Sequence, residues 1–206
     1  MKTILILVIS LISVHLAQAQ NTYILEGTIN ADTGTMVLVC IGTPSLYPGN
    51  IGDITTPVKN GKFMFRGTVN NPLAYTIGHK ENGKWDYISG IFFIEKGAQH
   101  ITCNIDSIRL IPAIENRTTI ELRSQYSAAL APIYAAYEVL NSRKDSLQRA
   151  YLKHIPSDVT AKIEAEKSNL KVQMDNAFMG YARQHPNSYV ILWKIADRMS
   201  NGYKPV

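Results

Sequence analysis

VKNGKFMFRG, residues 58–67, is the stretch that decides the fold of the first half of this chain. Asn60-Gly61 stands between strand-like residues, and both central positions of a type I′ turn need positive φ, which Asn and Gly tolerate best. After the turn, Phe63, Phe65, Gly67 and Val69 alternate with Lys62, Met64, Arg66 and Thr68, as in a strand that buries one face. The stretch therefore predicts a β-hairpin.

The residues on either side extend this strand pattern over the first half of the chain. A second Asn-Gly pair, Asn82-Gly83, predicts another hairpin. Roughly seven short strands joined by tight turns favour an antiparallel sandwich or barrel. The further predicted strands are Tyr23–Ile29, Thr35–Ile41, Ala74–His79, Trp85–Ile94 and His100–Ile105. The Gly- and Pro-rich segment Tyr47–Asp53 is predicted to be a loop.

Past Asn116 the apolar period changes from that of strands to that of helices. Apolar residues at steps of three, four or seven mark a long helix from Leu122 to Tyr151, with Pro132 predicted to kink or break it near Ala131. A second helix is predicted to start at Ser157 or Asp158 and to end at His185-Pro186. Asn187-Ser188 is predicted to cap a short third helix, which runs from Tyr189 to about Arg198. Its apolar residues are Val190, Leu192, Trp193 and Ile195.

Together these patterns predict the α+β class. We expect an antiparallel β-sandwich or barrel-like domain over residues 20–112, followed by a helical region over residues 113–206. The helical region should consist of an α-helical hairpin and the short third helix.

The first residues predict export. MKTILILVISLISVHLAQAQ has a positive charge at Lys2, an apolar run from Ile4 to Leu16 and a small-x-small triplet at Ala17-Gln18-Ala19. This pattern is typical of a secretory signal peptide, residues 1–19, cleaved after Ala19. We therefore expect a soluble periplasmic or extracellular protein without stable membrane insertion. The formal net charge of +5 comes from dispersed lysines and arginines, so we expect no nucleic-acid partner.

Two cysteines, Cys40 and Cys103, lie far apart in sequence, each in an apolar, strand-like run. An oxidising compartment would permit a disulfide between them, and the alternative is two buried free thiols that pack as small hydrophobes. The chain has no Cys-x-x-Cys motif.

The search for a catalytic constellation gives none. There is no Gly-x-Ser-x-Gly elbow and no phosphate-cradling glycine loop, and the mature histidines stand alone in their segments. His100 and Cys103 should point to opposite faces of a strand, which argues against a shared metal ion. Asn116-Arg117-Thr118 matches a glycosylation sequon, but is interpreted as a helix start. We name no catalytic, cofactor-binding or metal residues and expect no cofactor.

Four segments in order resemble a known family. They are Glu26-Gly27-Thr28-Ile29, residues 58–67 with Pro72 after them, Phe92-Phe93-Ile94-Glu95-Lys96-Gly97, and residues 181–189, YARQHPNSY. Together they resemble domain of unknown function 4369, the amino-terminal domain of exported bacterial thiol:disulfide interchange proteins. In that family a thioredoxin-like domain carrying Cys-x-x-Cys follows the helical hairpin. The present sequence stops before such a domain, and Cys40 and Cys103 match no catalytic position of the family.

The resemblance implies an exported accessory or interaction module without catalysis, either a stand-alone copy or a truncated one. Its expected partner is a protein of the cell envelope, with a thioredoxin-like protein as the candidate. Two alternatives stay open: thiol-disulfide exchange through Cys40 and Cys103 or through a partner thioredoxin-like protein, and the binding of small molecules or glycans near Tyr47–Asp53.

Overall fold

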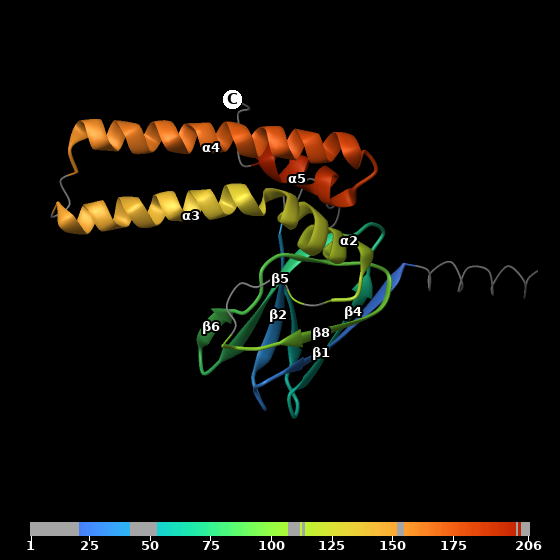
Figure 1. Ribbon diagram of the computed structural model, residues 1–206. Helices are drawn as coiled ribbons and strands as arrows, with labels where there is room; N and C mark the ends of the chain where they lie inside the picture. The colour runs from blue at the N-terminus through green and yellow to red at the C-terminus, as the bar shows by residue number, and fades with distance from the viewer. Residues whose placement is uncertain are drawn as a thin grey trace, which may run out of the picture. The chain divides into compact units, whose positions relative to one another are not determined.

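A computed structural model describes residues 21–41, 53–106, 112, 114–151, 155–200 and 202. The chain divides into two compact units, one up to Ile120 and one from Glu121. The first unit contains the strands and the second contains the long helices, so the predicted α+β class is confirmed (Figure 1). The predicted signal peptide and most of the predicted loop Tyr47–Asp53 lie outside the described residues.

The described part of the first unit has eight strands in two sheets. The three-stranded sheet has the order β4 (Lys62–Thr68), β1 (Thr22–Ile29), β8 (Gly97–Cys103). The five-stranded sheet has the order β3 (Ile54–Pro57), β2 (Thr35–Cys40), β5 (Leu73–Glu81), β6 (Lys84–Tyr87), and β7 (Phe92–Ile94) also pairs with β5. Every strand pair is antiparallel except β1 with β8, which is parallel. Parallel pairing needs a crossover rather than a tight turn, which no local sequence signal reveals.

Both Asn-Gly pairs form the predicted turns, since φ is positive at Asn60 (52°), Gly61 (69°), Asn82 (51°) and Gly83 (79°). Asn82-Gly83 joins β5 to β6, so this hairpin is confirmed. Asn60-Gly61 closes only the short Lys59–Lys62 pair, because β3 continues in the five-stranded sheet and β4 in the three-stranded one. This turn is therefore the corner where the chain crosses between sheets, and the prediction of a simple hairpin was too local.

The predicted strand Trp85–Ile94 is wrong as a single element, because it consists of β6 and β7 along one edge of β5. Between them, the Ile88 amide still donates to the Ile77 carbonyl (3.1 Å). The Ile77 amide instead donates to the buried Ser89 hydroxyl at 2.9 Å. A side-chain oxygen thus replaces a backbone partner where the ladder is interrupted, which satisfies a donor that would otherwise be buried and unpaired.

Aromatic rings of the three-stranded sheet cover glycines on the neighbouring strand. Gly27 of β1 pairs with Phe63 of β4, and Tyr23 of β1 pairs with Gly67 of β4. A Cβ at Gly27 would lie 2.0 Å from the Phe63 ring, and one at Gly67 would lie 2.7 Å from the Tyr23 ring. The two glycines therefore provide the space that these rings occupy beside the adjacent strand. The largest fully buried side chains of this unit, which form its core, include Leu25, Met36, Leu38, Phe65, Tyr75, Ile77, Phe92, Phe93, Ile94 and Ile101.

A buried polar network fixes the short helix α2 (Arg117–Ile120) to β7 and β8. The Phe93 backbone amide donates to the Thr119 hydroxyl (2.9 Å), and the Asn116 side-chain nitrogen Nδ2 donates to the Phe93 carbonyl (2.6 Å) and to Gln99 Oε1 (2.6 Å). Asn116 Oδ1 accepts from the Thr119 amide at 2.8 Å, which makes Asn116 the N-cap of α2. Glu95 Oε1 accepts from the Thr118 amide at 2.7 Å. Asn116 is only 6% exposed and caps α2, so its interpretation as a helix start is confirmed.

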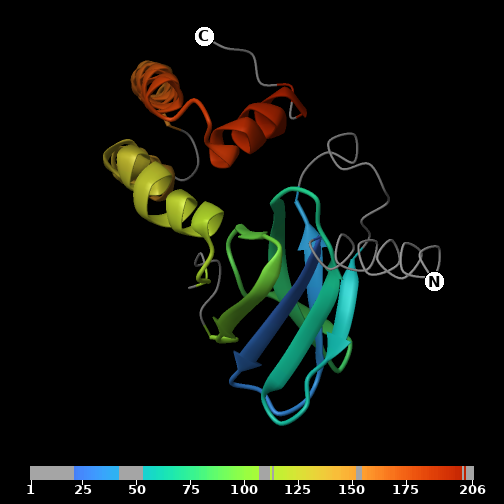
Figure 2. The ribbon, with the colours of Figure 1, turned by 90° about the vertical axis from the view of Figure 1, so that its right-hand side faces the viewer.

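The second unit begins with the π-helical turn η2 (Glu121–Tyr126) and continues with α3 (Ser127–Ala150), α4 (Ser157–Gln184) and α5 (Tyr189–Ser200). Helices α3 and α4 lie side by side as the predicted hairpin (Figures 1 and 2). The prediction that Pro132 kinks or breaks the helix near Ala131 is wrong as to a break, because α3 runs through Pro132. Packing against α4 can outweigh the one hydrogen bond that proline removes, and the helical geometry departs from α only earlier, at η2.

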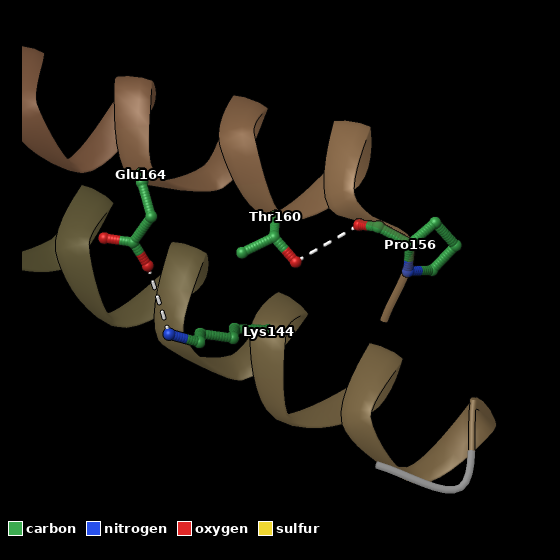
Figure 3. Close-up of polar contacts among 4 residues, drawn as sticks. All are labelled: Lys144, Pro156, Thr160 and Glu164. Atoms are coloured by element: carbon green, nitrogen blue, oxygen red, sulfur yellow. Dashed lines mark hydrogen bonds and ion pairs between the residues drawn. The ribbon is translucent and has the colours of Figure 1, made fainter. Parts of the chain in front are cut away.

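Polar contacts fasten the end of the hairpin where α4 begins (Figure 3). Lys144 Nζ lies 3.1 Å from Glu164 Oε1, and Arg143 and Glu166 form a second ion pair at 3.5 Å. The Thr160 hydroxyl donates to the Pro156 carbonyl (3.2 Å), as the Thr160 amide also does (3.0 Å). The charged side chains are 30% to 58% exposed, so each ion pair contributes little to stability but is consistent with one register of α3 against α4. The Thr160 bonds lie within the first turn of α4.

Candidate functional site

The turn between α4 and α5 is built from the residues HPNS that the sequence indicates as a helix break. The His185 amide still donates to the Tyr181 carbonyl at 2.9 Å, and Pro186 cannot continue the helix. The Ser188 hydroxyl accepts from the Ile191 amide at 3.1 Å, so Ser188 is the N-cap of α5, as the sequence predicts. This turn places Ser188 and Tyr181 beside η2.

Glu121 of η2 accepts hydrogen bonds from polar side chains at this turn. Its Oε1 accepts hydrogen bonds from the Tyr181 hydroxyl (3.2 Å) and from the Ser188 hydroxyl. The Tyr181 hydroxyl also lies 3.4 Å from Gln125 Oε1. Burial, the nearby Glu121 carboxylate and the hydrogen bond to it raise the pKa of Tyr181 to about 12. Tyr181 is therefore a neutral donor near pH 7, and the group Glu121, Gln125, Tyr181, His185 and Ser188 is called the η2 cluster below.

Aromatic side chains pack against the η2 cluster. The rings of Tyr181 and His185 stack with centroids 4.1 Å apart. Tyr126 meets Tyr181 edge to face at 5.5 Å and Phe178 at 6.5 Å. Tyr126 and Tyr181 are thus packed between helices, whereas Tyr134 and Tyr151 are each 46% exposed.

A second contact holds the far end of α5 to α4. Arg198 Nη1 lies 3.1 Å from Asp175 Oδ1, and the Arg198 guanidinium carbon lies 4.0 Å from the centre of the Phe178 ring. Both charged side chains are about four-fifths buried, with 20% and 19% exposed. A partly buried ion pair stacked on a ring is a specific contact, so α5 is fastened at both ends.

The hydrogen bonds of the η2 cluster give it a structural role, which is to hold the start of α5. The Ser188 hydroxyl donates a hydrogen bond to Glu121 Oε1 and accepts one from the Ile191 amide, so its oxygen is engaged as donor and as acceptor. Neither imidazole nitrogen of His185 has a hydrogen bond to Ser188 among the contacts of the described residues; the Ser188 amide donates to the His185 carbonyl instead (3.0 Å). An activated serine nucleophile needs such a base within hydrogen-bond reach. The cluster therefore positions α5.

The opposite face of α5 carries apolar side chains into solvent. Leu192, Ile195 and Met199 are 60%, 41% and 76% exposed and stand at steps of three and four residues, so they share one face of the helix. Val190, Ile191 and Trp193 of the same helix are buried. We call Leu192, Ile195 and Met199 the α5 row. Sequence periodicity assigned Leu192 and Ile195 to the packed stripe, and only the structure separates them from the buried residues.

The two cysteines that the sequence singled out are not brought together as a dithiol. Cys40 ends β2 in the five-stranded sheet and Cys103 ends β8 in the three-stranded sheet, and both are free thiols. Burial raises the pKa of Cys40 to about 11 and that of Cys103 to about 12. Near pH 7 both are thiols rather than thiolates, and the thiolate is the form that attacks disulfides. His100 is exposed while Cys103 is buried, as their opposite strand faces predict.

Three further observations complete the site. Within the described ranges, no group of three His, Cys, Asp or Glu side chains could hold a metal ion. Two shallow hollows flank the α3–α4 hairpin: one of about 250 Å³ beside Val139, Arg143 and Glu166, and one of about 420 Å³ beside Tyr137 and Lys171. None of the helices in the described part of the chain is long and apolar enough to span a bilayer.

Comparison with known proteins gives no assignment. The chain matches no protein-family model, and a search of the curated proteins finds no match either.

Proposed function

We propose that this chain is an exported interaction module without catalytic activity, and that it binds a thioredoxin-like protein of the cell envelope through the α5 row. The observation that supports this proposal is the α5 row itself: three large apolar side chains, 41% to 76% exposed, on a helix fastened at both ends. A rigid apolar face costs little ordering entropy on binding, which is what a docking surface needs.

The kind of partner follows from the resemblance to the amino-terminal domain of thiol:disulfide interchange proteins. In that family the helical region precedes a thioredoxin-like domain. A helix face at the end of the helical region is thus a reasonable place for a thioredoxin-like protein to bind. The state of the cysteines favours an accessory role, because neither Cys40 nor Cys103 supplies a thiolate near pH 7.

Binding of purified exported thioredoxin-like proteins from the same cell to the immobilised chain tests the proposal. Leu192→Asp and Met199→Asp should each weaken binding by about tenfold or more, because burying one such side chain contributes about 1.5–3 kcal/mol and 1.4 kcal/mol is a factor of ten. Val139→Asp is the matched control, since Val139 is 70% exposed on α3 and lies outside the α5 row. Equal binding by all three variants, or none by the unaltered chain, would rule out this surface and partner.

Export is tested separately. Expression of the full sequence in a bacterial host, followed by amino-terminal sequencing of the periplasmic fraction, should give Gln20 as the first residue. Recovery of the protein only from the cytoplasm with Met1 intact would contradict the proposal of export and leave the α5 row to be judged by binding alone.

A further inference from the structure

The two Asn-Gly turns have the same backbone type but different surroundings. At the first, the Asn60 amide donates to the Asp32 carbonyl (3.1 Å), and the Gly61 carbonyl accepts from the Ile29 amide (2.9 Å). A Cβ at Gly61 would also lie 3.0 Å from the Ile29 carbonyl oxygen. At the second, a Cβ at Gly83 would meet no heavy atom within 4 Å. The first turn is thus hydrogen-bonded to the end of β1 and to the loop after it, whereas the space where Gly83 would carry a side chain is open.

We propose that Asn82 is a site of spontaneous covalent modification, and that packing protects Asn60 from the same reaction. The Gly83 backbone nitrogen attacks the side-chain carbonyl carbon of Asn82, forms a carbon–nitrogen bond and loses its proton. The side-chain nitrogen leaves as ammonia, which gives a five-membered succinimide. Water then opens the ring at either carbonyl and yields aspartate or isoaspartate. Water is the single co-reactant, and no electrons are transferred.

The residue after the asparagine makes this reaction fast at both pairs, because glycine has no side chain to shield its nitrogen. The fold then separates the two pairs. Ring closure requires the turn backbone to leave its type I′ geometry, in which φ is 52° at Asn60 and 51° at Asn82. For Asn60 that movement breaks the hydrogen bonds to Asp32 and Ile29.

For Asn82 the nearest side-chain restraint lies one residue earlier. The Thr33 hydroxyl donates to Glu81 Oε1 at 2.7 Å, at a solvated position. That bond holds the end of β5. Among the described residues, neither Asn82 nor Gly83 has a side-chain hydrogen bond of this kind.

The modification would alter the β5–β6 hairpin. Aspartate at this position adds a negative charge next to Glu81, and isoaspartate lengthens the backbone of a two-residue turn by one carbon. Because register in such hairpins is set by the turn, the isoaspartate form should displace Trp85, whose ring lies against Gly78. A change in tryptophan fluorescence therefore reports the modification independently of the change in peptide mass.

The experiment follows both asparagines by peptide mass spectrometry while the purified chain ages at mildly alkaline pH, folded in buffer and unfolded in urea. In the folded chain Asn82 should convert at least about tenfold faster than Asn60, since one hydrogen bond of ordinary strength is worth about that factor. In urea the two rates should converge. Asn82→Gln should abolish the product at residue 82 and leave the slow conversion of Asn60 unchanged.

Three results would overturn the proposal. Equal rates in the folded chain would show that packing gives no protection, and no conversion of Asn82 in the folded chain would show that it is not a site. A preference for Asn82 that persists unchanged in urea would assign the difference to local sequence rather than to the fold.

Discussion

The ring of Phe63 lies so close to Gly27, its partner on the adjacent strand, that a Cβ at Gly27 would come within 2.0 Å of it. The same two strands contain the reciprocal pair, Tyr23 over Gly67. Glycine has no side chain to pack against its cross-strand partner, so the aromatic ring supplies the packing contact in each pair.

Gly27→Ala should therefore destabilise the first unit by about 1–3 kcal/mol, the usual cost of forcing extra atoms into a packed site. The midpoint of urea unfolding, followed by tryptophan fluorescence, measures this loss. In a Phe63→Leu background the cost of Gly27→Ala should shrink, because the ring that the methyl group meets is gone. A cost that is the same in both backgrounds would mean that the strain arises elsewhere.

Gly180→Ala should stabilise the second unit by about 0.5–1 kcal/mol. Gly180 lies inside α4, where a Cβ would meet no heavy atom within 4 Å, and alanine loses less backbone entropy than glycine on helix formation. Thermal unfolding followed by the helical circular dichroism signal measures the gain.

The matched control for that gain is Gly83→Ala, which has the same free space but φ of +79°. There the left-handed backbone should make alanine destabilising by about 1–2 kcal/mol. Stabilisation by both variants would show that open space alone, and not backbone conformation, decides the sign.

Thr119→Val should cost about 1–3 kcal/mol, because it leaves the buried Phe93 amide without its 2.9 Å acceptor while hardly changing the shape of the side chain. Hydrogen exchange should report the same change locally, as faster exchange of the Phe93 amide. The control is Thr102→Val on β8, an exposed threonine whose hydroxyl contact with Thr28 is 3.5 Å long. That variant should stay within about 0.5 kcal/mol of the unaltered chain. Equal losses in the two variants would contradict the role of Thr119.

Local chemistry explains which parts of the fold the sequence predicts. The Asn-Gly turns, the alternation after Asn60 and the Ser188 cap all depend on neighbours within a few residues, and each is present. The parallel β1–β8 pair and the crossing of the chain between sheets at Asn60-Gly61 depend on partners far away in sequence. Periodicity reports which face is apolar and not which strand lies beside it.

The candidate site was less accessible to sequence reasoning. Glu121 lies in a π-helical turn, for which no residue pattern was a signal, and it meets Tyr181 and Ser188 only because α4 and α5 fold back. Leu192 and Ile195 follow the same apolar periodicity as the buried Val190 and Trp193, so periodicity alone could not show that their side chains are exposed. Asn116 is the opposite case, because the local sequence predicted a helix start there and Asn116 does cap α2.

The two cysteines lead to a prediction on thiol reactivity. Because burial raises the pKa values of Cys40 and Cys103, an alkylating reagent at pH 8 should modify both slowly in the folded chain and rapidly in urea. Cys40 should react before Cys103, since Cys103 is the more deeply buried. Mass spectrometry of the alkylated peptides measures the two rates. Fast modification of either thiol in the folded chain would support the alternative of thiol-disulfide exchange.

The same shifts make stability depend on pH in the alkaline range. In the unfolded chain the thiols ionise near the ordinary value of 9.0, whereas the folded chain keeps them protonated until about pH 11 for Cys40 and about pH 12 for Cys103. Above pH 9 the unfolded state thus binds fewer protons than the folded state, so the free energy of unfolding falls as the pH rises. Urea unfolding between pH 7 and 11 measures the decline, and Cys40→Ala/Cys103→Ala should make it shallower. Some decline should remain, because burial also raises the pKa values of Tyr126 and Tyr181. An identical decline in the double variant would mean that the tyrosines alone cause it and that the thiols ionise alike in both states.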